Sequence, residues 1–219
     1  MCKDFNVFLF DLDGTITDSS VGITNSVMYA LKKYGIDEND RTKLYKFIGP
    51  PLADSFQKYY GFSSEQSLEA IKYYREYYTV KGIYENLVYE GFENVVKELK
   101  ARGKTLAVAT SKPEIFAKEI IRYFNLEQYF SCVAGIGLGE EINKSKADVI
   151  ADALERLGCK DKSKVLMVGD RMHDVEGARL NQISCIGVLY GFGTRDELEK
   201  AGATYIAETV NDILNIKTP

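Results

Sequence analysis

The most informative segment of the sequence is Val7-Phe8-Leu9-Phe10-Asp11-Leu12-Asp13-Gly14-Thr15, close to the N-terminus. Four bulky apolar residues run directly into two carboxylates, a glycine and a hydroxyl. Such an apolar run is typical of a strand buried on both faces of a sheet, and Gly14 marks the turn that ends it. We therefore expect Asp11 and Asp13 at the carboxyl end of a central parallel strand, where open α/β sheets bind their ligands.

The spacing of Asp11 and Asp13 indicates a cation site. The two residues are two positions apart, so an extended backbone points both carboxylates the same way. Like charges held this close are costly unless a cation or a proton is shared between them. The alternative is a solvated Asp-Gly turn without chemistry, because Asp-Gly is common turn sequence. This stretch alone leaves both interpretations open.

The composition fits a globular chain of one or two domains. The chain has 219 residues, of which 45% are hydrophobic and 27% are charged. A net charge of -4 and a pI near 5.3 argue against a nucleic-acid polymer or an anionic membrane as partner. Four widely spaced cysteines favour reduced thiols over disulfides or a zinc site. No apolar run is long enough to span a bilayer and no secretory pattern opens the chain, so we expect a cytoplasmic protein.

Residues 16–85 read as an all-helical block. Helical periodicity follows Asp18-Ser19-Ser20 and ends at Gly35, and further helices are predicted over 40–47, 52–60 and 64–81. A capping-box pattern, Ser63 to Gln66, opens the last of them. That helix carries a tyrosine stripe, which we interpret as packing and not as a ligand site; its members are Tyr73, Tyr74, Tyr77 and Tyr78.

From Gly91 onward the pattern alternates between helix and strand. Strands are predicted near 105–110, 132–134, 164–168 and 185–189, with helices over 92–101, 114–124, 147–157 and 175–180, followed by a weaker helix-strand-helix tail. Alternation of this kind predicts an α/β fold, a doubly wound parallel sheet with helices on both faces. The first strand belongs to this sheet, so the chain divides into a core of residues 1–15 and 86–219 and an inserted helical cap of residues 16–85.

Three more polar segments fall at or beside the carboxyl ends of predicted strands. They are Thr110-Ser111-Lys112, Asn143-Lys144-Ser145-Lys146 and Gly169-Asp170-Arg171-Met172-His173-Asp174. Each alone could be a cap, a solvated surface or a turn. Together they could converge on one crevice, where carboxylate oxygens favour Mg²⁺ over zinc. A divalent cation, a lysine and hydroxyl donors around a carboxylate form a plausible phosphoryl-transfer site.

These segments, in this order and spacing, resemble the four signature motifs of the haloacid dehalogenase superfamily. The motifs are Asp11-Leu12-Asp13-Gly14-Thr15, Thr110-Ser111, a downstream lysine and Gly169-Asp170-x-x-x-Asp174. The resemblance covers essentially the whole chain and implies a Rossmann-like core with a helical cap. Two further segments, Phe47 to Leu52 and Ala109 to Pro113, are similar to the phosphoglycolate phosphatase and 5'-nucleotidase-like branch.

The resemblance implies a role for each matching residue. Asp11 would be the nucleophile and a metal ligand, and Asp13 the general acid/base that also lends its backbone carbonyl to Mg²⁺. The phosphoryl group would be held by Thr110, Ser111 and the neighbouring Gly14 and Lys112. Asp170 would complete the Mg²⁺ site, with Asp174 in support. In the cap, Gly49 and Pro50 would contact the leaving group, although a simple turn between helices explains that loop equally well.

The lysine of the third motif has two candidates. We choose Lys144, because its offset to Asp148 fits the family, and we place it among the catalytic and substrate-binding residues. The family often has Lys-Pro-x-Pro here, whereas this chain has Lys144-Ser145-Lys146-Ala147, so Lys146 stays open as the alternative.

The expected activity is that of a Mg²⁺-dependent phosphatase working through phospho-Asp11 on a small phosphate ester such as phosphoglycolate or a nucleoside 5'-monophosphate. An acid at Asp13 favours phosphate-ester chemistry, because dehalogenases of the superfamily lack one there. A phosphomutase using the same phospho-aspartate and a non-catalytic phosphate-binding module remain alternatives. We expect no nucleic acid or membrane partner and a monomer, with a dimer left open.

Overall fold

A central parallel sheet organises the computed structural model, which describes residues 5–139 and 144–216. Its strand order is β5 (Cys132–Ile136), β4 (Thr105–Pro113), β1 (Val7–Phe10), β6 (Val165–Gly169), β7 (Ser184–Val188) and β8 (Tyr205–Ala207), and every adjacent pair is parallel. The predicted doubly wound α/β sheet is thus confirmed, with β1 in its interior. Within the described ranges, no helix combines the length and apolar character needed to cross a membrane.

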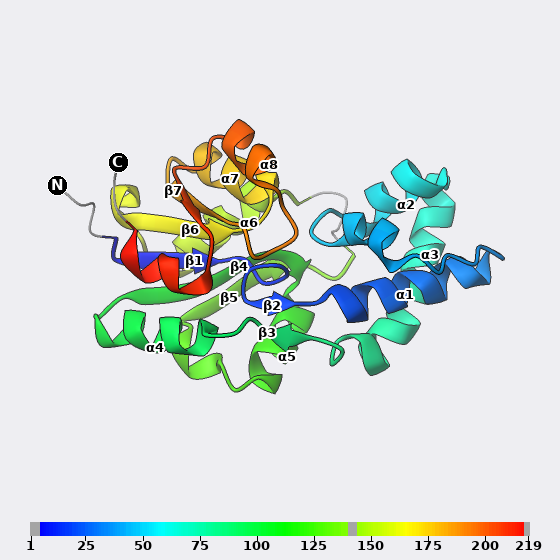
Figure 1. Cartoon of the computed structure of the whole chain (residues 1–219), viewed down its shortest axis with the longest axis horizontal. Helices are drawn as coiled ribbons and strands as arrows, with labels where there is room; N and C mark the ends of the chain where they lie inside the picture. The colour runs from blue at the N-terminus through cyan, green and yellow to red at the C-terminus, as the bar shows by residue number, and fades with distance from the viewer. Residues whose placement is uncertain (1–4, 140–143, 217–219) are drawn as a thin grey trace.

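Helices cover both faces of the sheet (Figure 1). On one face Phe8 and Phe10 of β1 pack with α4 (Phe92–Ala101) and α5 (Glu114–Tyr123). On the other, Leu9 packs with α6 (Lys146–Arg156), α7 (Met172–Leu180) and α8 (Arg195–Ala201). Because successive strand residues face opposite layers and both layers are apolar, β1 reads as a continuous hydrophobic run. Its first polar side chain, Asp11, falls where the sheet ends.

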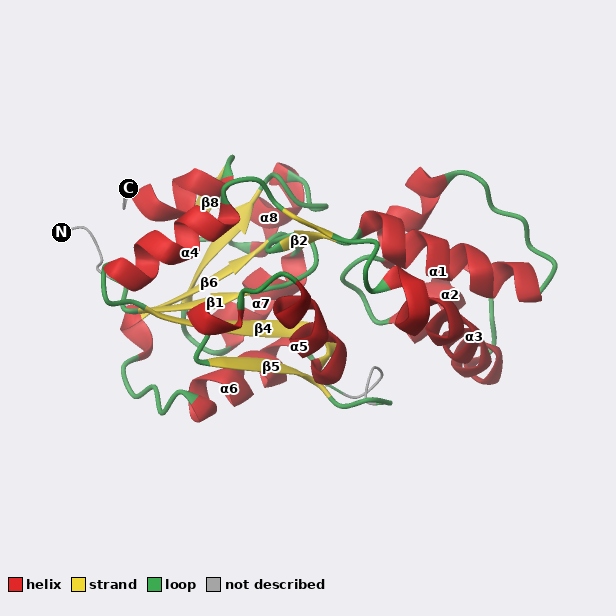
Figure 2. Ribbon diagram, turned by 90° about the horizontal axis from the view of Figure 1, so that it is seen from below, coloured by secondary structure: helices red, strands yellow, loops and turns green. Residues whose placement is uncertain are grey.

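The helices of residues 16–85 lie together beyond the carboxyl ends of the central strands (Figure 2). They are α1 (Ser20–Lys33), α2 (Leu52–Tyr60) and α3 (Ser64–Tyr77), with a 3₁₀ helix over Arg41–Phe47. The predicted capping box of Ser63 and Gln66 is present. Buried cap residues such as Phe47, Tyr74 and Tyr78 belong to the same hydrophobic cluster as Phe8 and Phe10, so the cap is packed onto the core.

The prediction of a strand-free block was wrong in one detail. β2 (Thr17–Asp18) pairs antiparallel with β3 (Leu87–Val88), which ties the two chain crossings between core and cap together. Two-residue strands are too short to produce an alternating pattern, so periodicity cannot reveal them. The last predicted turn of the 64–81 helix is also different, because Tyr78–Gly82 is π-helical. The domain boundaries at residues 15 and 85 stay a prediction.

Candidate active site

Asp11 stands at the end of β1 and is held by a lysine from another element. Its backbone N–H donates to the carbonyl of Val168 at 2.9 Å, which fixes the chain as it leaves the sheet. Its side chain is buried, and Oδ1 accepts a hydrogen bond from Lys146 Nζ at 2.5 Å. The same ammonium contacts Asp174 Oδ1 at 2.7 Å. One buried cation therefore joins the ends of β1, α6 and α7.

The lysine beside Asp11 is Lys146 and not Lys144, so our choice between the two is revised. Lys146 is the first residue of α6, and Ser145 and Asp148 form a capping box around it that fixes the direction of the first turn. Lys144 precedes that cap and lines the wall of the cleft, half-buried. The preceding Asn143 lies outside the described residues.

Three buried carboxylates form a group that could hold a metal ion. Asp11, Asp170 and Asp174 each offer an oxygen, and these oxygens lie within 4.8 Å of one another. Asp170 Oδ2 accepts from the Phe192 N–H at 2.8 Å, whereas Oδ1 is buried without a hydrogen-bond partner in the part of the chain that the structure describes. A buried carboxylate oxygen lacking a partner, in an all-oxygen group, fits a hard cation such as Mg²⁺.

Burial and charge repulsion shift the pKa values of this group. Burial raises the pKa of Asp11 to about 6, with Lys146 opposing the shift and Asp174 adding to it. Burial, and then repulsion by Asp174 and Asp11, raises the pKa of Asp170 well above its usual range. Burial disfavours the charged form of Lys146, but Asp11 and Asp174 together raise its pKa. One lysine therefore does not fully compensate the three carboxylates, and a divalent cation would lower the pKa values of both raised acids.

A collar of glycines lets the chain close around Asp170, and sequence reasoning missed most of it. Gly14 has a φ of +87°, and a Cβ built there would lie 2.2 Å from Asp170 Oδ2. A Cβ at Gly191 would lie 2.4 Å from Asp170 Cβ, and one at Gly193 only 1.8 Å from its carbonyl oxygen. The available signal was the Gly191-Phe192-Gly193 run after β7, because glycine pairs in such a place permit close backbone approach.

Asp13 has its own lysine, Lys112, distinct from the lysine that holds Asp11. Lys112 Nζ donates to both oxygens of Asp13, at 2.8 and 2.6 Å, inside the protein. The strand has already ended at Phe10, so the extended geometry that would point Asp11 and Asp13 the same way does not continue. The carboxylate of Asp13 lies outside the group of three acids, and a metal contact through its backbone carbonyl stays a prediction.

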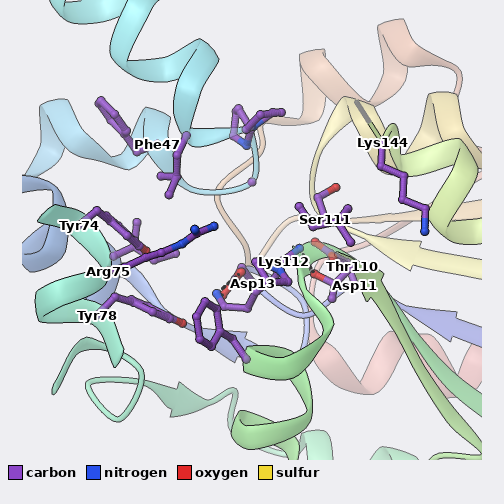
Figure 3. A pocket seen from close by; sticks show the side chains of 18 residues that line it. Asp11, Asp13, Phe47, Tyr74, Arg75, Tyr78, Thr110, Ser111, Lys112 and Lys144 are labelled. Atoms are coloured by element: carbon purple, nitrogen blue, oxygen red, sulfur yellow. Dashed lines mark hydrogen bonds and ion pairs between the residues drawn. The ribbon is translucent and has the colours of Figure 1, made fainter. Parts of the chain in front are cut away.

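The predicted residues of the second motif line the same cleft. Thr110 is buried in β4, and its Oγ1 accepts from the Lys112 N–H at 3.2 Å. Figure 3 shows Thr110 and Ser111 beside Asp11, with Lys144 on one side and Tyr74, Arg75 and Tyr78 of the cap on the other. The side chains of Thr110 and Ser111 therefore lie next to the candidate nucleophile (Figure 3).

The cap closes the cleft with a loop and with half of the tyrosine stripe. Gly49 and Pro50 line the cleft, and their contact with the leaving group stays a prediction. Arg171 Nη1 of the core donates to the carbonyl of Ile48 at 2.8 Å. Tyr74 and Tyr78 also line it, with stacked rings 5.2 Å apart. Interpreting the stripe as packing alone therefore missed these two side chains, because a helical pattern does not reveal which face meets a cleft.

Known proteins place the chain in a family. A model described as haloacid dehalogenase-like hydrolase matches residues 8–188, and the chain belongs to this family. A 5'-nucleotidase of Pseudomonas aeruginosa is 46% identical over 90% of this chain and 88% of its own length. A solved structure of a predicted phosphatase from Clostridium acetobutylicum is also 46% identical, covers 97% of this chain and 100% of its own, and gives a TM-score of 0.92. A protein named tyrosine-protein kinase PtkA, from Mycobacterium tuberculosis, is 36% identical over 94% of this chain and 70% of its own length. The resemblance inferred from the motifs is thus confirmed.

Proposed function

We propose that this chain is a cytoplasmic, Mg²⁺-dependent phosphatase that hydrolyses phosphate monoesters through a phospho-aspartate at Asp11. The observation that carries the proposal is the surroundings of Asp11: a buried carboxylate bonded to Lys146, grouped with two acids, and open to a cleft beneath the cap. A phosphate ester would be repelled by a bare carboxylate, so the nucleophile requires positive charge around it.

Each residue then has one task in two displacement steps. In the first, an oxygen of Asp11 forms a bond to phosphorus while the bond to the leaving oxygen breaks, and protonated Asp13 gives its proton to that oxygen. In the second, water attacks the phosphorus, Asp13 takes a proton from the water, and Asp11 is released with inorganic phosphate. Thr110 and Ser111 would bind the phosphoryl oxygens, and Lys146 would offset their charge.

The acids Asp11, Asp170 and Asp174 would hold Mg²⁺. The ion would supply compensation for the charge on the transferring group. Asp170, enclosed by the glycine collar, would serve as its fixed ligand from the core.

The cleft favours a leaving group with a ring. Beyond Asp13 it is lined by the side chains of Phe47, Tyr74, Tyr78 and Phe116. An aromatic wall suits a nucleoside better than a small acid such as glycolate, because a nucleoside buries more apolar area against it. The 46% identity to a protein named 5'-nucleotidase supports the same choice. We therefore propose nucleoside 5'-monophosphates as the first substrates to test, ahead of phosphoglycolate.

A phosphate-release screen tests the proposal. The purified chain is given nucleoside 5'-monophosphates, phosphoglycolate and sugar phosphates, with Mg²⁺ or with EDTA. We expect inorganic phosphate from the nucleotides, release abolished by EDTA, and none from Asp11→Asn. Isomerised sugar phosphate without phosphate release would indicate the phosphomutase instead. A chain inert toward every ester would support the binding module, and release unaffected by EDTA would contradict the role of the metal.

A further inference from the structure

Lys112 joins the candidate general acid of the core to the cap. Its ammonium contacts both oxygens of Asp13, and the two side chains are only 7% and 10% exposed. An ammonium that contacts both oxygens restrains the position of the ionised carboxylate, and the contact to the carbonyl oxygen remains when the group carries its proton. Burying such a pair costs desolvation that the attraction barely returns, so stability alone is a poor explanation for it.

Tyr78 of the cap contacts the other side of Lys112. The centre of its ring lies 5.2 Å from Lys112 Nζ, within the range of a cation–π contact. The ring is 2% exposed and is held between Tyr74, stacked at 5.2 Å, and Phe116, in an edge contact at 5.7 Å. Tyr78 also begins the π-helical turn, a rare conformation that often marks functional sites. Asp13, Lys112 and Tyr78 thus form a continuous buried chain from core to cap, visible in Figure 3.

We propose that Lys112 is a positioning residue that holds Asp13 for proton transfer to the leaving oxygen, and that Tyr78 holds Lys112. The inference rests on the proposed function, because it assigns a task to Lys112 within the same site. Lys112 binds Asp13, on the leaving-group side of the cleft, while Lys146 binds Asp11. Lys146 therefore acts on the nucleophile and Lys112 on the general acid. Because Tyr78 of the cap contacts Lys112, the alignment of Asp13 depends on the cap packing on the core as it does in this structure.

The test compares two esters that differ in their need for a proton. p-Nitrophenolate leaves without protonation, whereas the alkoxide of a nucleoside 5'-monophosphate requires it. The parameter measured is kcat/KM, which reports only the steps up to departure of the leaving group. We expect Lys112→Met to lower kcat/KM for the nucleotide on the order of a hundredfold, the range of general acid catalysis, and for p-nitrophenyl phosphate by less than about tenfold. Tyr78→Leu is also expected to lower kcat/KM more for the nucleotide than for p-nitrophenyl phosphate, but by a smaller factor.

Two further variants separate positioning from direct binding. The double variant Asp13→Asn with Lys112→Met should be no slower on the nucleotide than Asp13→Asn alone, because residues acting through one another are not additive. Lys112→Arg should recover part of the kcat/KM for the nucleotide that Lys112→Met loses, since a guanidinium can bind a carboxylate through two bonds. Lys144→Met is the matched control, because Lys144 is a second lysine of the cleft. It is expected to change kcat/KM by the same factor for both esters.

The outcomes are distinguishable. The positioning role would be overturned if Lys112→Met and Tyr78→Leu lowered kcat/KM equally for both esters. It would also be overturned if the losses in the double variant were additive. Neither result would contradict the phosphatase activity. A wild-type chain that releases phosphate from neither ester would overturn the proposed function, and the inference with it. Circular dichroism confirms that each variant is folded, and Lys112→Arg with Tyr78→Leu decides the question if Lys112→Met does not fold.

Discussion

At the scale of single residues, the site depends on how closely buried acids are brought together. Asp170 has one oxygen satisfied by the Phe192 N–H and one without a partner among the described residues. Gly14 and Gly191 leave no room for a side chain around it. The protein thus buries carboxylates close to one another, and burial, with repulsion by Asp174 adding to it, raises the pKa of Asp11 to about 6. Such an arrangement is stable when a cation neutralises it.

The binding of Mg²⁺ should therefore depend on pH. Asp11 has a raised pKa, so without metal it is protonated below about pH 6, and the ion must displace that proton to bind. We expect the association constant to fall as the pH drops through about 6, by about tenfold per pH unit for the proton on Asp11 and more steeply where Asp170 is protonated as well. Titration calorimetry of the metal-free chain from pH 5 to 8 measures it. Asp170→Asn, which loses a metal ligand, should bind Mg²⁺ weakly from pH 5 to 8. Equal Mg²⁺ affinity of the wild type at pH 5 and 8 would contradict binding by this group of acids.

At the scale of elements, the start of α6 decides which lysine reaches Asp11. Ser145 Oγ accepts from the Asp148 N–H at 3.3 Å, and the Asp148 carboxylate accepts from the Ser145 N–H at 2.9 Å. Lys146 follows as the first helical residue, directed at the carboxyl end of β1. The offset to Asp148 drew the sequence analysis to Lys144, but it carries no information on where the helix begins. The capping-box pattern Ser145-x-x-Asp148 was the signal that would have favoured Lys146.

Asp148→Ala should destabilise the protein in a pH-dependent way. Hydrogen bonds from the Ser145 side chain and backbone lower the pKa of Asp148. A lowered pKa contributes stability above the ordinary Asp range of about 4, and this contribution is lost as the pH falls through the folded-state value. We expect a loss of about 1 kcal/mol at pH 7, or about 2–4 °C in Tm, and a narrowing gap to wild type below about pH 4.

Glu65→Ala is the matched control for that change. Glu65 is also an acid in the first turn of a capped helix, α3, where the box is formed by Ser63 and Gln66 instead. Thermal unfolding followed by circular dichroism at several pH values compares the two variants. A pH-independent loss in Asp148→Ala, or an equal effect in Glu65→Ala, would refute the capping contribution.

At the scale of the whole molecule, the sequence predicted the strands and helices, which depend on local pattern. It did not predict the contacts between residues far apart in the chain. The apolar run into Asp11 correctly indicated a buried central strand, because periodicity and burial act along the chain. The predicted helix 52–60 coincides with α2, where Pro51 and Gly61 mark both ends. By contrast, the pairing of Asp13 with Lys112 and the contact of Arg171 with the Ile48 carbonyl join residues 99 and 123 positions apart. The first contact depends on how β1 and β4 lie side by side and the second on how the cap packs on the core, and no local spacing encodes either.

We propose that these distant segments meet to make Asp11 a nucleophile. Borohydride trapping tests it most directly, because borohydride reduces an acyl phosphate to an alcohol and so converts a phosphorylated aspartate to homoserine. The chain is mixed with Mg²⁺ and a nucleoside 5'-monophosphate, treated with borohydride during turnover, digested, and examined by mass spectrometry. We expect homoserine at position 11, formed only when substrate and Mg²⁺ are both present. Unmodified Asp11 in an actively turning-over sample, or homoserine at another aspartate, would contradict it.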